Sequence, residues 1–323
     1  MKALKRFAMV VPALLIGASV TMAEVTPDVP EVIRVIKKAA PDNAAIKPED
    51  MKKVDEALPK AATAKPAKPH KVLVLTRVAG FQHSSVGLGA YAMSEMGKRT
   101  GAYEATISND LANLAPDKLK EFDAVILCNM TGHWLEPKDN EVAGLSALGK
   151  DKAEITKAAL ASLLAFVDSG GGLMGFHSSS DANYEHPEFG KLIGGWFDGH
   201  PWHEKVQVKL ADPKHPLLAA FEGKDFEVTD EIYQFKDPYN LNNIHELLKL
   251  DPSTDQIKKT KRADKDCAIA WVRDQGKGHV FYSSLGHREE IYWNAMVMKF
   301  YLDGIQFVLG DIKADAKPTG TAQ

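Results

Sequence analysis

The chain has 323 residues, of which 45% are hydrophobic and 26% are charged, and its formal net charge is −3. This composition is typical of a globular protein with one large core or two small ones, and it excludes a fibre and a wholly disordered chain. The mildly acidic balance also argues against a nucleic-acid partner, because nucleic-acid phosphates require a basic protein face.

The N-terminus has the pattern of a secretory signal peptide over residues 1–23. Three basic residues, the last at Arg6, precede an apolar run at residues 7–16, and small residues that suit a signal peptidase end at Ala23. A membrane anchor is the weaker interpretation, because a bilayer-spanning helix needs roughly 20 apolar residues. We therefore expect a periplasmic or secreted protein with no membrane attachment after cleavage. Cleavage would remove three basic residues and no acidic one, and so would take the net charge from −3 to −6.

Composition divides the rest of the chain into three parts. Residues 24–70 are rich in Ala, Lys and Pro, which is typical of an N-terminal segment that ends in a linker. Within them, residues 27–39 and 48–57 have weak helical patterns, which leaves open either two short helices on the domain or no order. Residues 71–310 are predicted to form the folded domain, and residues 311–323 a flexible tail.

Strands and helices alternate through the first half of the domain. Strands are predicted at residues 71–76, 103–107, 124–128 and 173–176, of which 71–76 and 124–128 have the pattern of buried strands, and helices are predicted at residues 87–100, 116–121 and 152–169. Strands that are buried on both faces and alternate with helices form parallel sheets. This half is therefore predicted to be a doubly wound α/β fold with a mostly parallel sheet.

The second half of the domain has more closely spaced strands. They are predicted at residues 205–210, 227–235, 245–250, 267–273 and 279–284, before a helix at residues 292–309. This pattern predicts an antiparallel extension whose last strand and helix return to the same sheet. The two cysteines, Cys128 and Cys267, lie in apolar strands and are interpreted as buried free thiols rather than as a disulfide.

Polar and aromatic residues follow the ends of several predicted strands. Ligands of open α/β sheets bind beyond the carboxyl ends of the strands, so these positions are candidates for a site. The candidates are Phe81, His83, Thr131, His177, Ser178 and His287. The run before His177 matches the letters of G-x-G-x-x-G, but it ends a helix and opens a strand, so it does not indicate a dinucleotide site. An imidazole at this position can act as an acid or base, bind substrate or hold a metal, and a purely structural role is the alternative.

Two further segments add candidate residues. His200 and His203 lie three apart in a turn that enters a strand, and this spacing alone is weak evidence for zinc, because a defined zinc site needs three or four ligands. In the next strand, Glu231 and Tyr233 point to one face and Asp230 to the other. A carboxylate and a phenol on one face can hold or protonate a sugar hydroxyl, and a cross-strand hydrogen-bonding pair is the alternative.

Taken together, these segments resemble the trehalose-utilisation family, the ThuA-like proteins, over residues 71–310. The resemblance is carried by GFQH at 80–83, GGGLMGFHS at 170–178, the G-H-P turn within 197–201, TDEIY at 229–233 and VFYSSLGH at 280–287. It implies a fold that is flavodoxin-like and similar to class I glutamine amidotransferases. It also implies a pocket that contains His83, His177, His200, Glu231, Tyr233 and His287, while His203 lies outside the pattern. Because His177 replaces the amidotransferase cysteine, glutamine hydrolysis is not expected.

The family is associated with trehalose, sucrose and related glycosides, including routes through 3-keto sugars. The resemblance therefore implies that this protein acts on a small-molecule carbohydrate, as a lyase, isomerase or hydrolase, with His177 and Glu231 as the catalytic acid and base. A sugar-binding module without turnover, which supports a partner enzyme, is the alternative.

The remaining candidates are assigned to binding. Substrate is expected to contact His83, Phe81, Thr131, Ser178, Trp202, Tyr233 and His287, with Trp202 or Phe81 stacked on the sugar ring. A divalent metal such as zinc, if the site uses one, is expected on His177, His200 and His287. The sequence leaves open the sugar, the bond, the metal and the oligomeric state, a homo-oligomer included.

Overall fold

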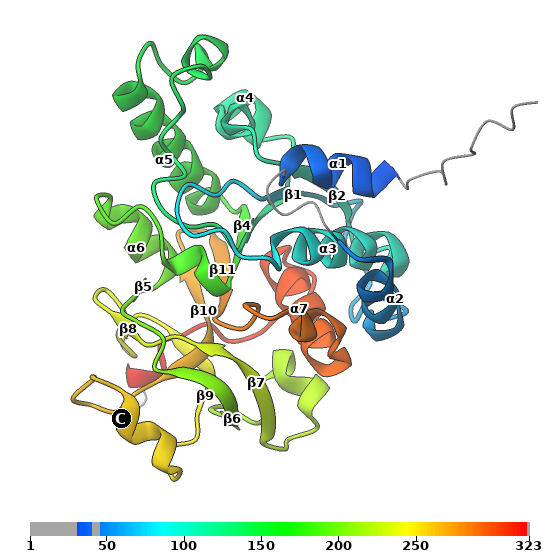
Figure 1. The fold of residues 1–323 in the computed structure, drawn as a ribbon, viewed down its shortest axis with the longest axis vertical. Coiled ribbons are helices and arrows are strands. Elements are labelled where there is room, and N and C mark those ends of the chain that lie inside the picture. Colours follow the sequence, from blue (N-terminus) through cyan, green and yellow to red (C-terminus); the bar gives the residue numbers. More distant parts are fainter. Residues whose placement is uncertain (1–30, 41–45, 322–323) are drawn as a thin grey trace, which may run out of the picture.

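A computed structural model describes residues 31–40 and 46–321, and the predicted signal peptide lies outside this part of the chain (Figure 1). One nine-stranded sheet runs through the molecule. Its strands, in spatial order, are β2 (Glu104–Ser108), β1 (Lys71–Leu75), β3 (Ala124–Cys128), β4 (Gly172–Phe176), β11 (Gly278–Ser283), β10 (Ala268–Gln275), β9 (His245–Leu250), β6 (Trp202–Leu210) and β7 (Phe226–Ile232).

The sheet has a parallel half and an antiparallel half. The pairings from β2 through β1, β3 and β4 to β11 are all parallel, and those from β11 through β10, β9 and β6 to β7 are all antiparallel. This confirms the predicted α/β fold with a parallel first half, an antiparallel extension and a last strand that returns to the sheet. The strand predicted at residues 227–235 is interrupted, because β8 (Phe235–Lys236) leaves the main sheet and pairs with β5 (Trp196–Phe197).

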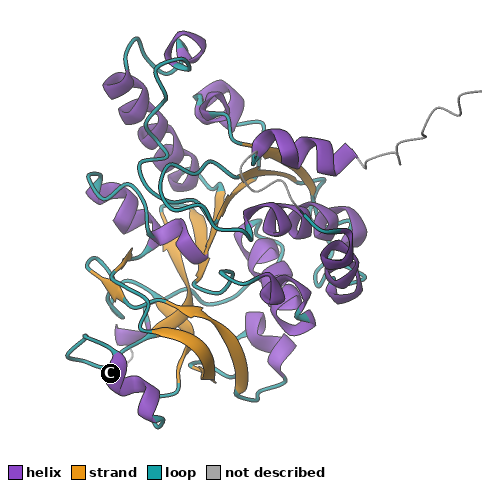
Figure 2. Ribbon diagram, in the orientation of Figure 1, coloured by secondary structure: helices purple, strands orange, loops and turns teal. Residues whose placement is uncertain are grey.

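Helices cover both faces of the sheet (Figure 2). One face carries α1 (Glu31–Ala39), α2 (Pro48–Ala57), α3 (Val86–Thr100) and α7 (Ala295–Val308), and the other carries α4 (Pro116–Leu119), α5 (Lys152–Asp168) and α6 (Pro187–Ile193). Successive side chains of a strand point to opposite faces. In β1, Val72 and Val74 therefore join the first core, while Leu73 and Leu75 join the second. Among the described residues, no helix is both long and apolar enough to span a bilayer.

The last helix begins later than the pattern predicts. A 3₁₀ helix occupies Glu289–Trp293, and α7 follows it after Asn294. The side chain of Asn294 accepts hydrogen bonds from the amides of Met296 and Val297 at 3.0 and 3.3 Å. Such a cap satisfies amides that the first helical turn cannot, and it fixes the start of α7 at residue 295.

The segment predicted as a linker is held against α7. The amides of Thr63 and Ala64 donate to Oε1 of Gln306 at 2.7 and 3.1 Å, and the amide of Ala67 donates to Asp311 at 2.9 Å. Upstream, α1 and α2 place apolar side chains in the core on the same side of the sheet. Residues 31–40 and 46–70 therefore form a layer of the folded structure.

The segment predicted as a flexible tail also lies on the domain. His215 donates through Nε2 to the carbonyl of Asp315 at 2.9 Å, and His245 donates through Nδ1 to the carbonyl of Lys317 at 2.8 Å. Two imidazoles from the antiparallel half thus hold the chain near its end. Both cysteines, in turn, are buried and free of disulfides, as the sequence predicts.

The sheet curls strongly between its two halves. Five strand pairings separate β4 from β7, and at about 4.8 Å for each pairing a flat sheet would hold these strands about 24 Å apart. Two side chains can bridge only part of that distance. Yet Oε2 of Glu231, on β7, lies 3.5 Å from Nε2 of His177, which directly follows β4. The curl brings the far edge of the antiparallel half over the carboxyl ends of the parallel strands.

Candidate metal centre

Four side chains from four separate segments meet at the carboxyl ends of the parallel strands. His83 comes from the loop after β1, His177 directly follows β4, His287 lies after β11, and Glu231 belongs to β7. One ligand atom from each of them lies within 4.8 Å of every other. We call these four residues the inner cluster.

His177 lies at the middle of the inner cluster. Its Nε2 is 3.2 Å from Nε2 of His83, 3.2 Å from Nδ1 of His287 and 3.5 Å from Oε2 of Glu231. Nδ1 of His287 is in turn 3.2 Å from the same carboxylate oxygen. Two ligands that each lie about 2.05 Å from a tetrahedral zinc ion are separated by about 3.3 Å. The four distances therefore match the spacing of ligands around one metal ion.

The protonation of His177 also suits a metal ligand. Its Nδ1 lies 2.8 Å from the carbonyl oxygen of Ser284, which can only accept, so Nδ1 carries the hydrogen. A neutral imidazole protonated on Nδ1 presents a lone pair on Nε2, and here that lone pair faces the inner cluster. The main-chain carbonyl is an outer contact of the kind that fixes the tautomer and orientation of metal-ligating histidines.

Burial and the neighbouring imidazoles set the charges of two members of the inner cluster. Burial, together with the nearby His177 and His287, lowers the pKa of His83 from 6.5 to about 3, which keeps this imidazole neutral. Burial by itself raises the pKa of Glu231, but the hydrogen bonds and charges that His177 and His287 supply when they are protonated outweigh it and hold that pKa far below its ordinary value. A neutral imidazole and an ionised carboxylate are the forms that bind metal ions.

The backbone at His177 is held in an uncommon conformation. Its φ is +47°, in the left-handed region that residues other than glycine rarely adopt. The hydroxyl of Tyr282 donates to the carbonyl of His177 at 2.6 Å, and the register pairs Ser283 with Phe176, so Ser284 lies beside His177. The strained turn at the end of β4 therefore directs the ring into the inner cluster.

The loop that carries His287 is fixed by buried polar groups. Asp230 is fully buried, and its carboxylate accepts from the amide of Gly286 at 2.7 Å and from the amide of Arg288 at 2.9 Å. The carbonyl of Gly286 accepts from Asn129 Nδ2 at 3.0 Å. Gly286 itself has φ +130°, and a Cβ there would lie 2.8 Å from the hydroxyl of Tyr292. Asp230 and Glu231, adjacent in β7, thus serve one centre from opposite faces of the strand.

The rim of the inner cluster is aromatic and partly exposed. Phe81 is 66% exposed, and its ring centroid lies 4.8 Å from that of His83. The hydroxyl of Tyr233 is 3.2 Å from Nε2 of His177, and burial raises the pKa of this phenol, so it stays protonated. On the outer side, Nδ1 of His200 and Nδ1 of His203 face Oε1 of Glu231 at 3.4 and 3.9 Å.

The structure brings together most of the predicted pocket residues but changes their grouping. The predicted metal ligands are His177, His200 and His287. In the structure, His177 and His287 lie together with His83 and Glu231 in the inner cluster. His200 instead contacts the second oxygen of Glu231.

Of three further predicted substrate contacts, two are directed elsewhere and the third is buried. The prediction for Trp202 is wrong, because its side chain is fully buried in the core and its indole N–H donates to the carbonyl of Gln256 at 2.8 Å. The hydroxyl of Thr131 donates to the carbonyl of Phe81 at 2.7 Å and so positions the loop after β1. Ser178 is fully buried.

His203 is the site residue that the sequence pattern does not include. The register of β6 and β7 places it directly opposite Glu231. Neighbouring residues of a strand point to opposite faces. A strand that begins at Trp202, with the indole in the core, would therefore have predicted that His203 points away from the core, towards the site.

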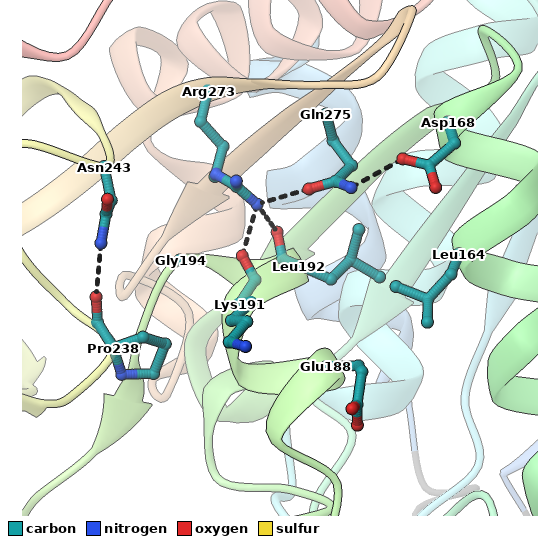
Figure 3. A pocket seen from close by; sticks show the side chains of 10 residues that line it. All are labelled: Leu164, Asp168, Glu188, Lys191, Leu192, Gly194, Pro238, Asn243, Arg273 and Gln275. Atoms are coloured by element: carbon teal, nitrogen blue, oxygen red, sulfur yellow. Dashed lines mark hydrogen bonds between the residues drawn. The ribbon is translucent and has the colours of Figure 1, made fainter.

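A second hollow shares no lining residue with the inner cluster (Figure 3). Arg273 is the main polar group in it, and this side chain donates to the carbonyls of Lys191 and Leu192 at the end of α6. The guanidinium therefore caps a helix, a structural role that accounts for its position.

The fold and the centre define a class of protein: a mixed α/β sheet with three imidazoles and a carboxylate gathered over the ends of its parallel strands. The family model for trehalose utilisation, ThuA, matches residues 71–308, and the chain belongs to this family. No curated protein matches the chain.

Two solved structures are similar to this chain. A ThuA-like protein from Bacteroides uniformis ATCC 8492 has a TM-score of 0.56 at 21% identity, over 76% of this chain and 94% of that chain. A ThuA-like protein from Parabacteroides merdae ATCC 43184 has a TM-score of 0.53 at 17% identity, over 75% of this chain and 90% of that chain. At these identities the likeness shows the fold.

Proposed function

We propose that this protein is an exported enzyme, periplasmic or secreted, that acts on a glycoside or a 3-keto sugar at a divalent metal ion held by the inner cluster. The observation that carries the proposal is the convergence of His83, His177, His287 and Glu231 within 4.8 Å. The description of the family as trehalose utilisation supports a sugar as the substrate. The strand order β2-β1-β3-β4-β11 supports the finer proposal that the parallel half is flavodoxin-like.

The donor set supports zinc or another first-row transition metal. Imidazole and carboxylate suit such ions, and three histidines with one carboxylate leave room for a substrate oxygen when the ion accepts a fifth ligand. A bound ion would supply Lewis-acid chemistry, because it polarises a carbonyl oxygen or acidifies a hydroxyl group.

Metal binding would change the roles of His177 and Glu231. Nε2 of His177 and the carboxylate of Glu231 both face the ion position, so both would orient substrate and balance charge rather than move protons. Proton transfer then belongs to the groups around them. Tyr233 offers a protonated phenol, and burial raises the pKa of Asp181, whose carboxylate is held by the hydroxyl of Tyr184 at 2.7 Å.

A sugar ring has a natural place at the rim. The exposed face of Phe81 lies beside His83, and aromatic rings stack on the apolar faces of sugars. A keto group of the bound sugar would then lie towards the inner cluster. Enolisation next to this keto group, followed by elimination or isomerisation, requires a polarised carbonyl, which the ion would supply, and a proton acceptor, for which the carboxylate of Asp181 is the candidate.

The test is an assay of the metal-loaded protein with trehalose, sucrose and their 3-keto derivatives, with products identified by mass spectrometry. We expect turnover of at least one keto sugar. Glu231→Gln should lower kcat/KM by about 100-fold or more, because it removes charge from the reacting centre, with a much smaller loss of sugar affinity in calorimetry. Binding without turnover would favour the alternative of a sugar-binding module, and full activity of Glu231→Gln would rule out the proposed centre.

A further inference from the structure

The two oxygens of Glu231 face two different sets of imidazoles. Oε2 lies 3.2 Å from His287 and 3.5 Å from His177, within the inner cluster. Oε1 lies 3.4 Å from Nδ1 of His200 and 3.9 Å from Nδ1 of His203, on the exposed side. We infer that His200, His203 and Oε1 of Glu231 form a second cation subsite, which shares Glu231 with the inner cluster as a bridging carboxylate. The inference rests on the proposed function, since it adds a second ion to the same centre.

The backbone places both histidines near one oxygen of Glu231. His203 lies in β6 directly opposite Glu231 in β7, where side chains of paired strands are neighbours. His200 lies in the turn before β6, next to Gly199, whose φ is +107°. The ring of Phe197 is stacked on His200 at 5.8 Å, which orients the imidazole.

The ring of His203 also links the two subsites. Its centroid lies 4.9 Å from that of His287, a member of the inner cluster. The two imidazoles thus lie next to each other while their Nδ1 atoms face different oxygens of Glu231. This is the arrangement expected of ligands to two ions that lie close together.

The kinds of donor atoms around Glu231 suit a second ion. The neighbouring carboxylate, Asp230, points away and is engaged by the amides of Gly286 and Arg288, so its charge is directed to the loop behind the centre. One carboxylate is then surrounded by imidazoles on both of its oxygens. Neutral imidazoles and a bridging carboxylate are ordinary ligands of paired transition-metal ions.

The outer subsite differs from the inner cluster in its access to solvent. The side chains of His200 and His203 are 52% and 45% exposed, whereas those of His177 and Glu231 are 0% and 8% exposed. An open ion position with three protein ligands is typical of catalytic sites, where water or substrate completes the coordination.

Two adjacent ion positions select the substrate class. Paired metal ions bind groups that offer two neighbouring oxygens, one for each ion. A sugar with a ketone next to a hydroxyl group, such as a 3-keto glycoside, has this pair of oxygens. The inference thus narrows the proposed substrate to an α-hydroxy ketone.

The experiment is a calorimetric titration of chelator-treated protein with Zn²⁺, checked by metal content after dialysis. We expect two ions per chain for the wild type and one for the double variant His200→Ala, His203→Ala. Glu231→Gln should also lose the outer ion. The matched control is His133→Ala. His133 is also an exposed histidine paired with a glutamate, because its Nδ1 lies 2.8 Å from Glu185. This variant should still bind two ions per chain.

The outcomes separate this inference from the proposed function. One ion in both the wild type and the double variant, lost in His177→Ala, would overturn the outer subsite and leave the metal-dependent function standing. An outer ion that persists in Glu231→Gln would mean ordinary surface binding to two histidines and would also overturn the bridge. No ion in the wild type would reject the metal in both proposals.

Discussion

His177 shows how one side chain can be fixed from every direction. Its backbone is in the left-handed region, its carbonyl accepts from Tyr282, and its Nδ1 donates to Ser284. These contacts fix the orientation of the ring, so Nε2 points into the inner cluster. Backbone strain of this kind costs of order 1–3 kcal/mol and persists where the surroundings impose it, often at functional sites.

Phe81 provides the first test at this scale. Phe81→Ala should weaken binding of the sugar substrate about five-fold, because an aromatic contact contributes about 1 kcal/mol, and it should leave the melting temperature unchanged since the ring is 66% exposed. Met296→Ala is the matched control, because Met296 is also a large exposed apolar residue, at 41%. Equal sugar affinity in calorimetry for the wild type and Phe81→Ala would exclude stacking on this ring.

His83 predicts a pH dependence of stability in the metal-free protein. Its pKa is about 3 in the folded protein, against 6.5 for an unperturbed histidine, so between these values the unfolded chain binds a proton that the folded chain does not. Stability should therefore fall as the pH drops from about 6.5 towards 3. Melting temperatures measured with chelator at pH 7, 5.5 and 4 should decrease more for the wild type than for His83→Gln. Parallel decreases in the two proteins would contradict this account.

At the scale of the elements, β7 is the strand that organises the centre. Its adjacent carboxylates point to opposite faces, so Glu231 enters the inner cluster while Asp230 holds the loop that carries His287. The two functions cannot be exchanged without a shift of register, because a slip by one residue would turn each side chain to the other face.

Asp230→Ala tests this organisation. It leaves the buried amides of Gly286 and Arg288 without their acceptor, and we expect a loss of about 2–3 kcal/mol in the free energy of unfolding. The affinity for Zn²⁺ should fall about ten-fold or more, as when other outer contacts of metal ligands are removed. Denaturant unfolding and calorimetry measure both effects. Thr229→Ala, on an exposed position of the same strand, should change neither, and unchanged Zn²⁺ affinity in Asp230→Ala would exclude the positioning role.

The sequence predicts features that depend on neighbouring residues better than features that depend on contacts between distant parts of the chain. The apolar runs of β1, β3 and β4 reveal their strands directly, because burial on both faces requires continuous apolar residues. The sequence suggests a pocket position for Trp202 because the turn before it obscures where β6 begins, and alternation counted from that start sends the indole into the core. The curl that brings Glu231 to His177 accumulates over five pairings and has no local pattern in the sequence.

At the scale of the whole molecule, the described residues before β1 belong to the folded structure. Asp303 and Gln306 of α7 are fully buried, and they bind Thr63 and Ala64 of the preceding segment. Composition does not predict this contact. A segment rich in Ala, Lys and Pro looks like a linker because it has few apolar side chains, but its backbone amides can still bind it to the domain. The polar side chains on α7 that receive these amides lie more than two hundred residues further along the chain.

Truncation tests the contribution of this segment. A chain that begins at residue 71 would leave buried polar groups of α7 unpaired and apolar core surface exposed. Its melting temperature should be lower by about 5 °C or more, since each kcal/mol lost shifts a domain of this size by about 2–4 °C. A chain that begins at residue 24 keeps every one of these contacts and is the control. Equal melting temperatures for the two chains, measured by circular dichroism, would show that the segment adds no stability.

Because the sheet curls, the inner cluster connects the two halves of the sheet as well as forming the proposed reaction site. His177 and Glu231 join strands that are five pairings apart, so an ion held between them works against any tendency of the sheet to flatten. If the proposed ion is bound, its loss would remove that restraint from the loop of His287 and from the edge formed by β6 and β7, and the twisted sheet could then relax there. In the proposed function, the same four side chains would serve both the shape of the sheet and the chemistry, and both halves of the sheet would be needed to form the centre.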